Sequence, residues 1–280
     1  MQAYKEYLQY VLDNGVHTPN RTGVDTISCS GYMFKHDMRT GFPLLTSKKM
    51  GIKNIASELE MFIKGITSKK FLQDRSNHIW DEWCNPKKVP YGHDEETKAK
   101  MMAEDDLGPV YGKQWVCFNG DSENGNQLKN AIDIIKNNPT SRRILVSAWN
   151  PLQLNEMALP PCHVGFQLLC YPDKTMDIIW VQRSIDSFLG LPYDIASYGL
   201  LLTLICKETG YTPRYLIGML GSCHIYENHL DVIKEQLTRP THKLPTVEIE
   251  NWKSIWEWEY TDVKLLNYVS EGRLVGAIAV

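Results

Sequence analysis

The chain has 280 residues, of which 43% are hydrophobic, and it carries a formal net charge of −3 with an isoelectric point near 6.2. This length and hydrophobic content suffice for a sizeable buried core, and the weakly acidic charge argues against nucleic acid or an anionic membrane as the main partner. The apolar runs are far shorter than the roughly 18 residues that a membrane span needs. Because the N-terminal segment is charged rather than signal-like, we expect a soluble, intracellular protein of the cytoplasm.

No internal repeat, low-complexity block or linker divides the sequence, so the simplest expectation is a single domain over residues 1–280. The seven cysteines include no C-x-x-C pair, which argues against both a disulfide framework and a zinc site. No metal is therefore expected. Cys170, Cys206 and Cys223 lie inside apolar segments and are expected to be small buried residues.

Hydrophobic periodicity predicts helices over residues 3–13 and 53–65. The polar and charged segment 84–108 is expected to form a surface excursion. Branched and aromatic residues predict strands over 142–150, 163–172 and 175–184. The run from 194 to 210 predicts a long buried helix that ends at Gly210. Together these elements predict an α+β fold in which a mixed or antiparallel sheet packs against long helices.

Cys162 is the cysteine whose sequence surroundings suggest chemistry. It follows two prolines that stiffen the chain, and it precedes His163 at the start of a predicted strand. The neighbouring predicted strands carry Arg142, Arg143 and Arg183. Arginines in this arrangement suit a phosphate anion and would lower the pKa of the thiol. Surface ion pairing of the arginines is the open alternative.

A set of segments in one order resembles the thymidylate synthase family. They are RTG at 21–23, TSKK at 46–49, SELEMFIKG at 57–65, IWDEW at 79–83, LGPVYGKQW at 107–115, SRR at 141–143, ALPPCH at 158–163, QRSIDSFLGLPYDIASY at 182–198, HIYENH at 224–229 and a terminal AV. The resemblance covers residues 4 to 280. It implies an α+β sandwich in which two subunits pack sheet on sheet, and each site of this homodimer takes arginines from the partner subunit.

The resemblance also implies catalytic roles. Cys162 would be the nucleophile that adds to carbon 6 of a pyrimidine nucleotide, so that carbon 5 can attack the one-carbon unit of 5,10-methylenetetrahydrofolate. Glu58 would organise waters that move protons on and off the base, although an ordinary surface glutamate is the alternative. Tyr111 would lie beside the reacting carbons. His163 would tune the thiol or support the base through water, and a structural role is equally open.

The implied binding residues fall into a nucleotide set and a folate set. The phosphate would be held by Arg21, Arg183 and Ser184, together with Arg142 and Arg143 of the partner subunit, while His224 and Tyr226 would bind the sugar 3′-hydroxyl and Gln182 would complete the nucleotide set. The folate pocket would be lined by Ile79, Trp80, Trp83, Leu159, Asp186, Leu189, Gly190 and Val280. Within that pocket, the Asp186 carboxylate suits the hydrogen-bond donors of a pterin ring.

Asp194, in GLPYDIASYG, departs from the family pattern. Synthases carry asparagine there, whose amide donates to the uracil 4-carbonyl and accepts from the ring N–H. Cytosine reverses this edge, and a carboxylate can accept from its amino group and share a proton with its ring nitrogen. Asp194 is therefore predicted to select cytosine. A helix N-cap is the alternative role.

These features predict a deoxycytidylate 5-hydroxymethylase that converts dCMP to 5-hydroxymethyl-dCMP, in the deoxycytidylate (hydroxy)methylase-like branch of the family. Departures at Glu60, Met61, Val116 and Ser222 favour water access to the intermediate, whereas IWDEW and the terminal residues look like a synthase. The alternatives are a dCMP 5-methylase that yields 5-methyl-dCMP and dihydrofolate, and then a thymidylate synthase acting on dUMP. A nucleic-acid-binding relic without turnover is an alternative of another class, and the acidic charge disfavours it.

Overall fold

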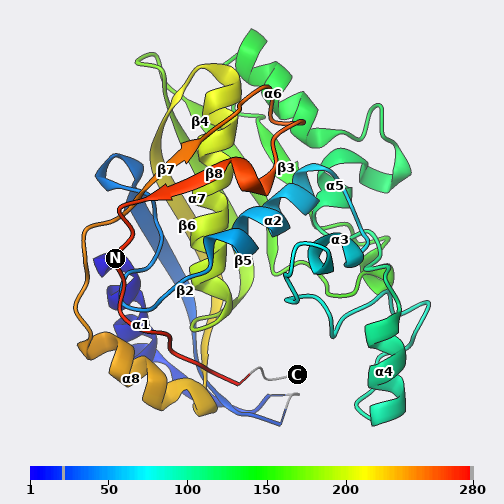
Figure 1. Cartoon of the computed structure of the whole chain (residues 1–280), viewed down its shortest axis with the longest axis vertical. Helices are drawn as coiled ribbons and strands as arrows, with labels where there is room; N and C mark the ends of the chain where they lie inside the picture. The colour runs from blue at the N-terminus through cyan, green and yellow to red at the C-terminus, as the bar shows by residue number, and fades with distance from the viewer. Residues whose placement is uncertain (21–22, 278–280) are drawn as a thin grey trace.

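The structure is a computed structural model of the chain, and it describes residues 1–20 and 23–277 (Figure 1). A six-stranded sheet with the order β1-β2-β6-β5-β4-β3 forms its centre. The strands are β1 (Val16–Thr18), β2 (Thr26–Asp37), β3 (Leu145–Ser147), β4 (His163–Cys170), β5 (Thr175–Asp186) and β6 (Thr212–Tyr226). Neighbours run antiparallel except β5 and β6, which are parallel. The mixed sheet confirms the predicted α+β class.

Helices cover one face of this sheet, and a small second sheet lies beside them (Figure 1). The helices are α1 (Gln2–Asn14), α2 (Ile52–Ile63), α3 (Lys70–Gln73), α4 (Glu95–Ala103), α5 (Gly112–Val116), α6 (Gln127–Asn137), α7 (Gly190–Thr209) and α8 (Leu230–Thr238). The second sheet pairs β7 (Thr246–Ile249) with β8 (Val263–Leu266). The helices predicted over 3–13 and 53–65 correspond to α1 and α2.

Helix α7 is the central helix of the core. It contacts β5, β6 and α2, and the ring of Tyr198 stacks on Trp180 of β5 with centroids 5.4 Å apart. It ends at Gly210, where the left-handed φ of 74° suits glycine, as predicted. The helix begins at Gly190, however, so Asp194 lies inside its first turns and not before them. The N-cap alternative for Asp194 is therefore wrong.

The strand predicted over 142–150 is much shorter than expected, because β3 comprises only Leu145–Ser147. The regular ladder stops where the amides of Ala148 and Trp149 both donate to the carbonyl oxygen of Val164, at 2.9 and 3.2 Å. Because Ala148 and Trp149 both face Val164, the regular alternation of side chains between the two faces of the strand ends there. The predictions over 163–172 and 175–184 agree with β4 and β5.

The segment 84–108 carries α4 on the surface, as expected, and projects from the body in Figure 1. Its anchor is Lys69, whose side chain is fully buried. The Lys69 ammonium donates to the carbonyl oxygens of Asp81, Trp83 and Met101 at 2.9, 3.1 and 2.7 Å. Three charge-assisted bonds offset the cost of burying this cation and attach the excursion to the core.

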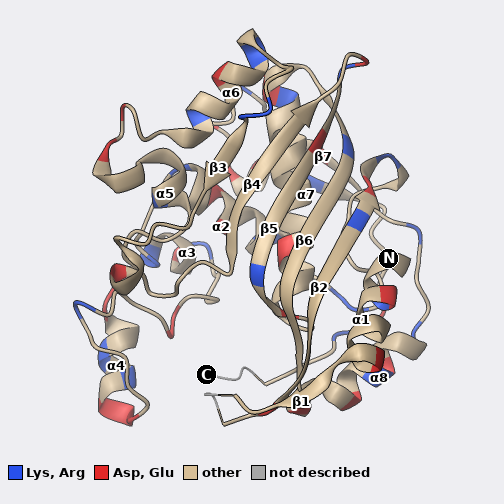
Figure 2. Cartoon of the chain, turned by 180° about the vertical axis from the view of Figure 1, so that it is seen from behind, with Lys and Arg blue, Asp and Glu red and all other residues tan. Residues whose placement is uncertain are grey.

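The other face of the large sheet carries no helix (Figure 2). Met33, Leu145, Val181 and Met219 are large apolar side chains on its strands, and each is 44% to 62% exposed. Met33 is the register partner of Met219, which in turn pairs with Val181, and neighbouring exposed apolar side chains of this kind suit an association surface. Within the described ranges, no helix combines the length and apolar character needed to cross a membrane.

Candidate active site

Cys162 lies at the entrance to β4, and its backbone is held from two sides. Its amide donates to the Tyr111 hydroxyl at 2.9 Å, and its carbonyl accepts from the Arg183 amide at 2.8 Å. The Arg183 guanidinium donates to the carbonyl oxygens of Pro160 and Pro161, both at 2.9 Å. Arg183 thus fixes the Pro-Pro-Cys turn, and β5 positions the thiol through it.

The thiol of Cys162 is not activated in the way that the sequence suggested. Burial raises its pKa, the negative field of Asp194 raises it further, and the opposing effect of Arg183 does not outweigh them. The expectation that nearby arginines lower the pKa of this thiol is therefore wrong for the isolated chain. The resting thiol keeps its proton and must lose it when it attacks.

Arg142 and Arg143 are exposed and lie far from Cys162 of the same chain. Strand β3 runs antiparallel to β4 with Leu145 opposite Gln167, and the Gln167 amide donates to the Arg142 carbonyl at 2.9 Å. The two arginines therefore lie at the far end of β4, about 25 Å from its entrance at ~3.3 Å per residue. One chain alone cannot bring them to its own thiol.

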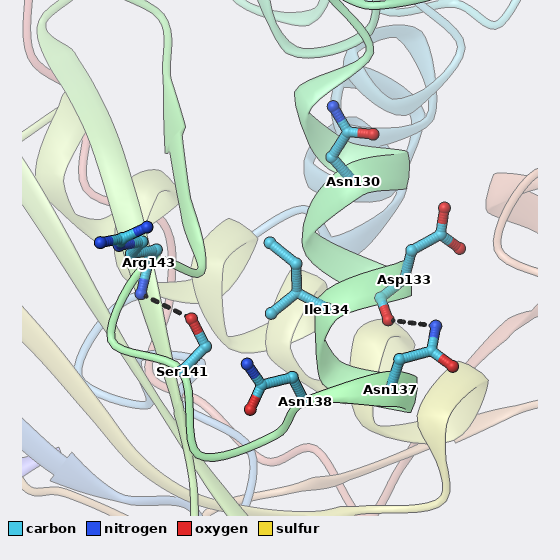
Figure 3. A pocket seen from close by; sticks show the side chains of 7 residues that line it. All are labelled: Asn130, Asp133, Ile134, Asn137, Asn138, Ser141 and Arg143. Atoms are coloured by element: carbon cyan, nitrogen blue, oxygen red, sulfur yellow. Dashed lines mark hydrogen bonds between the residues drawn. The ribbon is translucent and has the colours of Figure 1, made fainter.

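Figure 3 shows the surroundings of Arg143, an open hollow of about 560 Å³ between α6 and the loop before β3. Its lining side chains are Asn130, Asp133, Ile134, Asn137, Asn138, Ser141 and Arg143. The Arg143 amide donates to the Ser141 hydroxyl at 3.1 Å, which fixes the loop. The guanidinium stays exposed and available to another molecule.

Asp194 lies within a hydrogen-bonded network between α7 and β5. The Gln182 amide donates to its Oδ2 at 2.7 Å, and Trp180 donates to the Gln182 carbonyl oxygen at 3.0 Å, which fixes the amide orientation. Only 19% of the Asp194 side chain is exposed. Burial raises its pKa to about 7, and although the Gln182 bond opposes this, the negative charges of Glu58 and Asp186 add to it. Asp194 therefore exchanges its proton near neutrality.

His163 is buried and neutral. Its Nδ1 is 2.8 Å from the Tyr198 hydroxyl, and its ring stacks on Tyr111 with centroids 4.1 Å apart. Burial lowers its pKa to about 3, so the 3.8 Å approach of its Nε2 to Asp194 is not an ion pair. These contacts direct the ring nitrogens toward Tyr198 and Asp194, and they favour the structural role over tuning of the Cys162 thiol.

Glu58 projects from α2, and its carboxylate accepts from the Trp80 indole N–H at 2.7 Å. Burial raises its pKa to about 7, against the effect of this bond. The surface-glutamate alternative is therefore wrong. Glu58 and Asp194 are two carboxyl groups, on different helices, that can gain or lose a proton at the pH of the cell.

The residues predicted to bind the sugar lie where the parallel strands β5 and β6 end together. His224 is the register partner of Asp186, and Ser184 pairs with Ser222. The rings of His224 and Tyr226 meet edge to face with centroids 5.2 Å apart, and burial lowers the pKa of His224. Polar side chains from β5 and β6 thus meet at the carboxyl ends of these two strands.

Three of the predicted folate residues, Asp186, Leu189 and Gly190, lie between the end of β5 and the start of α7. Asp186 accepts from the amides of Phe188 and Leu189 through one oxygen, at 3.0 Å each, and its second oxygen leaves capacity for further donors. Ile79 is 40% exposed, whereas Trp80 is buried. Trp83, Leu159, Leu189 and Gly190 are half-buried. Arg21 and Val280 lie outside the described residues.

Two further residues, Lys48 and Tyr198, lie beside predicted site residues although the sequence predicted no role for them. Lys48 is buried, donates to the Phe188 carbonyl oxygen at 2.5 Å and lies 3.9 Å from the centroid of its ring. Burial lowers its pKa to about 8, and the charge of Asp186 opposes that shift. Tyr198 is the partner of His163. Lys48 lies in the TSKK segment and Tyr198 ends the QRSIDSFLGLPYDIASY segment, so both stood in family motifs that gave the available signal.

Glu60 does not lie where it could admit water, as its sequence position had suggested. Its carboxylate is fully buried and accepts from Lys64 at 2.6 Å and from the Tyr260 amide at 3.1 Å, with Arg75 at 3.5 Å. These contacts join α2 to the segment before β8. Glu60 therefore acts in packing, and it gives no support to the expected route for water.

The Cys162 thiol lies at a strand entrance, and the carboxyl groups of Asp194 and Glu58, with pKa values of about 7, act with it on Tyr111. Such a set of groups suits nucleophilic addition coupled to proton transfer. The thymidylate synthase family model matches residues 2–280, and the chain belongs to the thymidylate synthase family. The chain is 46% identical to the thymidylate synthase of Mycoplasma genitalium, 43% to that of Mycoplasma pneumoniae and 42% to that of Malacoplasma penetrans. Each comparison covers the full length of both chains.

These relatives are named thymidylate synthases, so the predicted deoxycytidylate 5-hydroxymethylase and its substrate dCMP are wrong. The error came from treating Asp194 as a permanent carboxylate. Because burial raises its pKa to about 7, the side chain can also be a neutral acid. A neutral acid has one O–H donor and one carbonyl acceptor, which is the hydrogen-bonding pattern of an asparagine amide.

Proposed function

We propose that this chain, a folate-dependent one-carbon transferase of a family that uses 5,10-methylenetetrahydrofolate, is a thymidylate synthase. It methylates dUMP at carbon 5 to give thymidylate and dihydrofolate. The observation that carries this proposal is the grouping of Cys162, Asp194 and Glu58 around Tyr111. The pKa values of the two carboxyl groups are both about 7. The names of the relatives support the methyl product.

Cys162 supplies the nucleophile. Its sulfur bonds to carbon 6 of the pyrimidine, and carbon 5 then carries the electron density for carbon–carbon bond formation. The fixed Pro-Pro-Cys turn limits the motion of the sulfur, which lowers the entropic cost of reaching the attack geometry. Bound folate supplies the one-carbon unit and the hydride that reduces it.

Asp194 reads the base in its protonated form. Its O–H donates to the uracil 4-carbonyl, and its carbonyl oxygen accepts from the ring N–H. The Gln182 amide donates to Asp194 Oδ2, so Oδ2 is the carbonyl oxygen of the protonated acid. Its second lone pair accepts from the ring N–H, and Oδ1 carries the proton. An ionised Asp194 would face the uracil carbonyl without a donor, at a cost of about 1–3 kcal/mol.

Glu58 moves protons at the other side of the site. A carboxyl group with a pKa of about 7 both accepts and donates protons efficiently at neutral pH. Trp80 holds one of its oxygens through the 2.7 Å bond, which leaves the other for water or the base. Glu58 thereby serves the removal of the proton from carbon 5.

Phosphate binding requires a second subunit. Arg142 and Arg143 lie at the far end of β4, so the proposal assigns the phosphate of each site to Arg21, Arg183 and Ser184 with Arg142 and Arg143 of the partner subunit. The uncovered sheet face of Met33, Leu145, Val181 and Met219 offers the apolar surface for a homodimer.

The residues around the start of α7 fit a folate. Ile79 provides an exposed apolar surface next to Trp80, and Asp186 has an oxygen with capacity for ring N–H donors. A flat aromatic ring that carries donors on one edge needs this combination of apolar contact and a convergent acceptor. Lys48 adds positive charge to the same region, which suits a carboxylated cosubstrate.

The assay incubates the protein with dUMP and 5,10-methylenetetrahydrofolate, then identifies the nucleotide by mass and measures dihydrofolate. We expect thymidylate and dihydrofolate in equal amounts. A nucleotide product that carries hydroxymethyl, or one-carbon transfer without dihydrofolate, would contradict the proposal. The same assay on dCMP, in parallel, measures how strongly the site discriminates between the bases.

The shared site has its own test. A chain with Cys162→Ala and a chain with Arg142→Glu are each expected to be inactive as homodimers. Exchanged heterodimers contain one site with an intact thiol and an intact partner arginine, so part of the activity should return. Heterodimers that stay inactive, although both parents fold, would contradict the sharing of arginines.

A further inference from the structure

Two cysteines outside the catalytic machinery lie directly opposite each other on two adjacent strands. Cys29 of β2 and Cys223 of β6 are direct register partners in an antiparallel pair. Directly opposed residues in such a pair have Cα atoms about 4.5–5.5 Å apart. A disulfide accepts Cα separations of about 4.4–6.8 Å. The backbone of β2 and β6 therefore already has the spacing that a disulfide needs.

The side chains meet as well. The two thiols lie close enough for each to shift the pKa of the other, and the Tyr7 hydroxyl of α1 also acts on the Cys223 thiol. Tyr7 packs edge to face on Tyr32, with ring centroids 5.1 Å apart. The Tyr7 contact holds the Cys223 sulfur beside Cys29, so little reorganisation is needed to bring the sulfurs into bonding distance.

The pair is accessible from one side. Cys223 is fully buried, whereas Cys29 is half-buried. Cys29 lines an open groove of about 480 Å³, together with Tyr10, Asn14, Val16, Ser28, Ser30 and Ser222. A small oxidant can therefore reach Cys29 first, and Cys223 is the thiol placed to react second.

We propose that Cys29 and Cys223 form a cross-strand disulfide when the protein meets a peroxide. The Cys29 sulfur attacks one oxygen of hydrogen peroxide and breaks the O–O bond, which gives a sulfenic acid and one water. The Cys223 sulfur then attacks the Cys29 sulfur, the S–O bond breaks, and a second water leaves. The two thiols lose two electrons and two protons, and the peroxide is reduced to two waters.

Burial raises the pKa of both thiols, that of Cys223 to about 11. The thiolate is the reactive form, so the pair stays reduced under mild conditions and its oxidation accelerates as the pH rises. Once formed, the link joins segments that are far apart in the sequence, and such cross-links restrict the unfolded chain most strongly. The disulfide thus stabilises the contact between β2 and β6.

The test treats the whole protein with hydrogen peroxide at pH 8.5, blocks the remaining thiols and maps the peptides by mass spectrometry. We expect a linked pair of peptides containing Cys29 and Cys223, and a thermal midpoint higher by about 5 °C. Neither readout needs turnover, so the test does not depend on the proposed synthase activity.

Cys29→Ser is the main variant, because the half-buried site tolerates a hydroxyl, and it should lose both the linked peptides and the rise in midpoint. Cys170→Ser, at another half-buried strand cysteine, is the matched control and should keep both. Absence of the Cys29–Cys223 link in the oxidised parent overturns the proposal. Preferential linkage of another pair, such as Cys170 with Cys206, overturns it too, as does a link that leaves the midpoint unchanged.

Discussion

Two regions of the molecule bury carboxylates in opposite ways. Asp177 of β5 receives two parallel bonds from Arg214 of β6 at 2.7 and 2.8 Å, and Glu60 has Lys64 and Arg75 beside it. Near Cys162, Asp194 has a neutral amide as its donor and Glu58 has an indole. Asp177 and Glu60 have cationic partners, and these contacts hold packed elements together. Asp194 and Glu58 have only neutral donors and pKa values of about 7, which suits the proton transfers proposed for them.

The largest effect is expected in the region around Cys162. Cys162→Ala removes the nucleophile, and we expect kcat for dUMP to fall by about 10⁴-fold or more. Unfolding should change little, because Tyr111 and Arg183 hold the Cys162 backbone and not its sulfur. Thermal unfolding provides the control. Residual activity within a hundredfold of the parent would show that another group attacks the base.

Glu58→Gln should have the next largest effect. The amide keeps a hydrogen bond from Trp80 but cannot exchange protons, so we expect kcat to fall by about 10²–10⁴-fold. The binding of dUMP, measured by calorimetry, should stay within a few-fold of that of the parent. A variant that loses binding and keeps kcat would assign Glu58 to positioning and not to proton transfer.

Glu60→Gln is the matched change in the packing region. It leaves Lys64 and Arg75 without their buried partner, so we expect a loss of about 1–3 kcal/mol in the free energy of unfolding. The activity per folded molecule should stay close to that of the parent. Denaturant titration and kcat measured on the same sample separate the two effects, and a hundredfold loss of kcat with full stability would place Glu60 in the site.

The smallest expected effect concerns pH. Asp194 must be protonated to read uracil, and its pKa is about 7, so its contribution to kcat/KM for dUMP should be constant below pH 7 and fall about tenfold per pH unit above it. Asp194→Asn supplies the same donor and acceptor without titrating. The alkaline slope of the variant should therefore be shallower by one unit. His163, Tyr111, Tyr198, Glu58, Asp186 and Cys162 surround Asp194 and stay unchanged in the comparison.

A second readout links this effect to the proton itself. If dUMP selects the protonated form, its binding at pH 8 takes up a proton at Asp194. Calorimetry in two buffers of different ionisation enthalpy measures that uptake, which should shrink in Asp194→Asn. Equal slopes and equal proton uptake in both proteins would show that Asp194 does not carry the proton that reads the base.

Much of the fold could be predicted from local sequence. The apolar period of 3.6 residues placed α1 and α2, and the branched and aromatic runs placed β4 and β5, because these signals act between near neighbours in the chain. The end of α7 at Gly210 followed from the backbone freedom of glycine. The edge strand β3 was overestimated, since its length depends on how Val164 of β4 pairs with it.

The sequence by itself determined the family, and it predicted Cys162 as the nucleophile, because long motifs preserve chemistry and order. Only the tertiary structure decided the protonation of those residues. Asp194 was predicted to be a carboxylate that selects cytosine, yet its pKa depends on burial by α7 and β5 and on the charges of Glu58 and Asp186. Likewise the effect of Arg183 on the thiol pKa is outweighed by burial, and Arg183 also donates to two proline carbonyls, which no local pattern predicted. Desolvation and electrostatic fields are sums over segments distant in the chain, and no local pattern contains them.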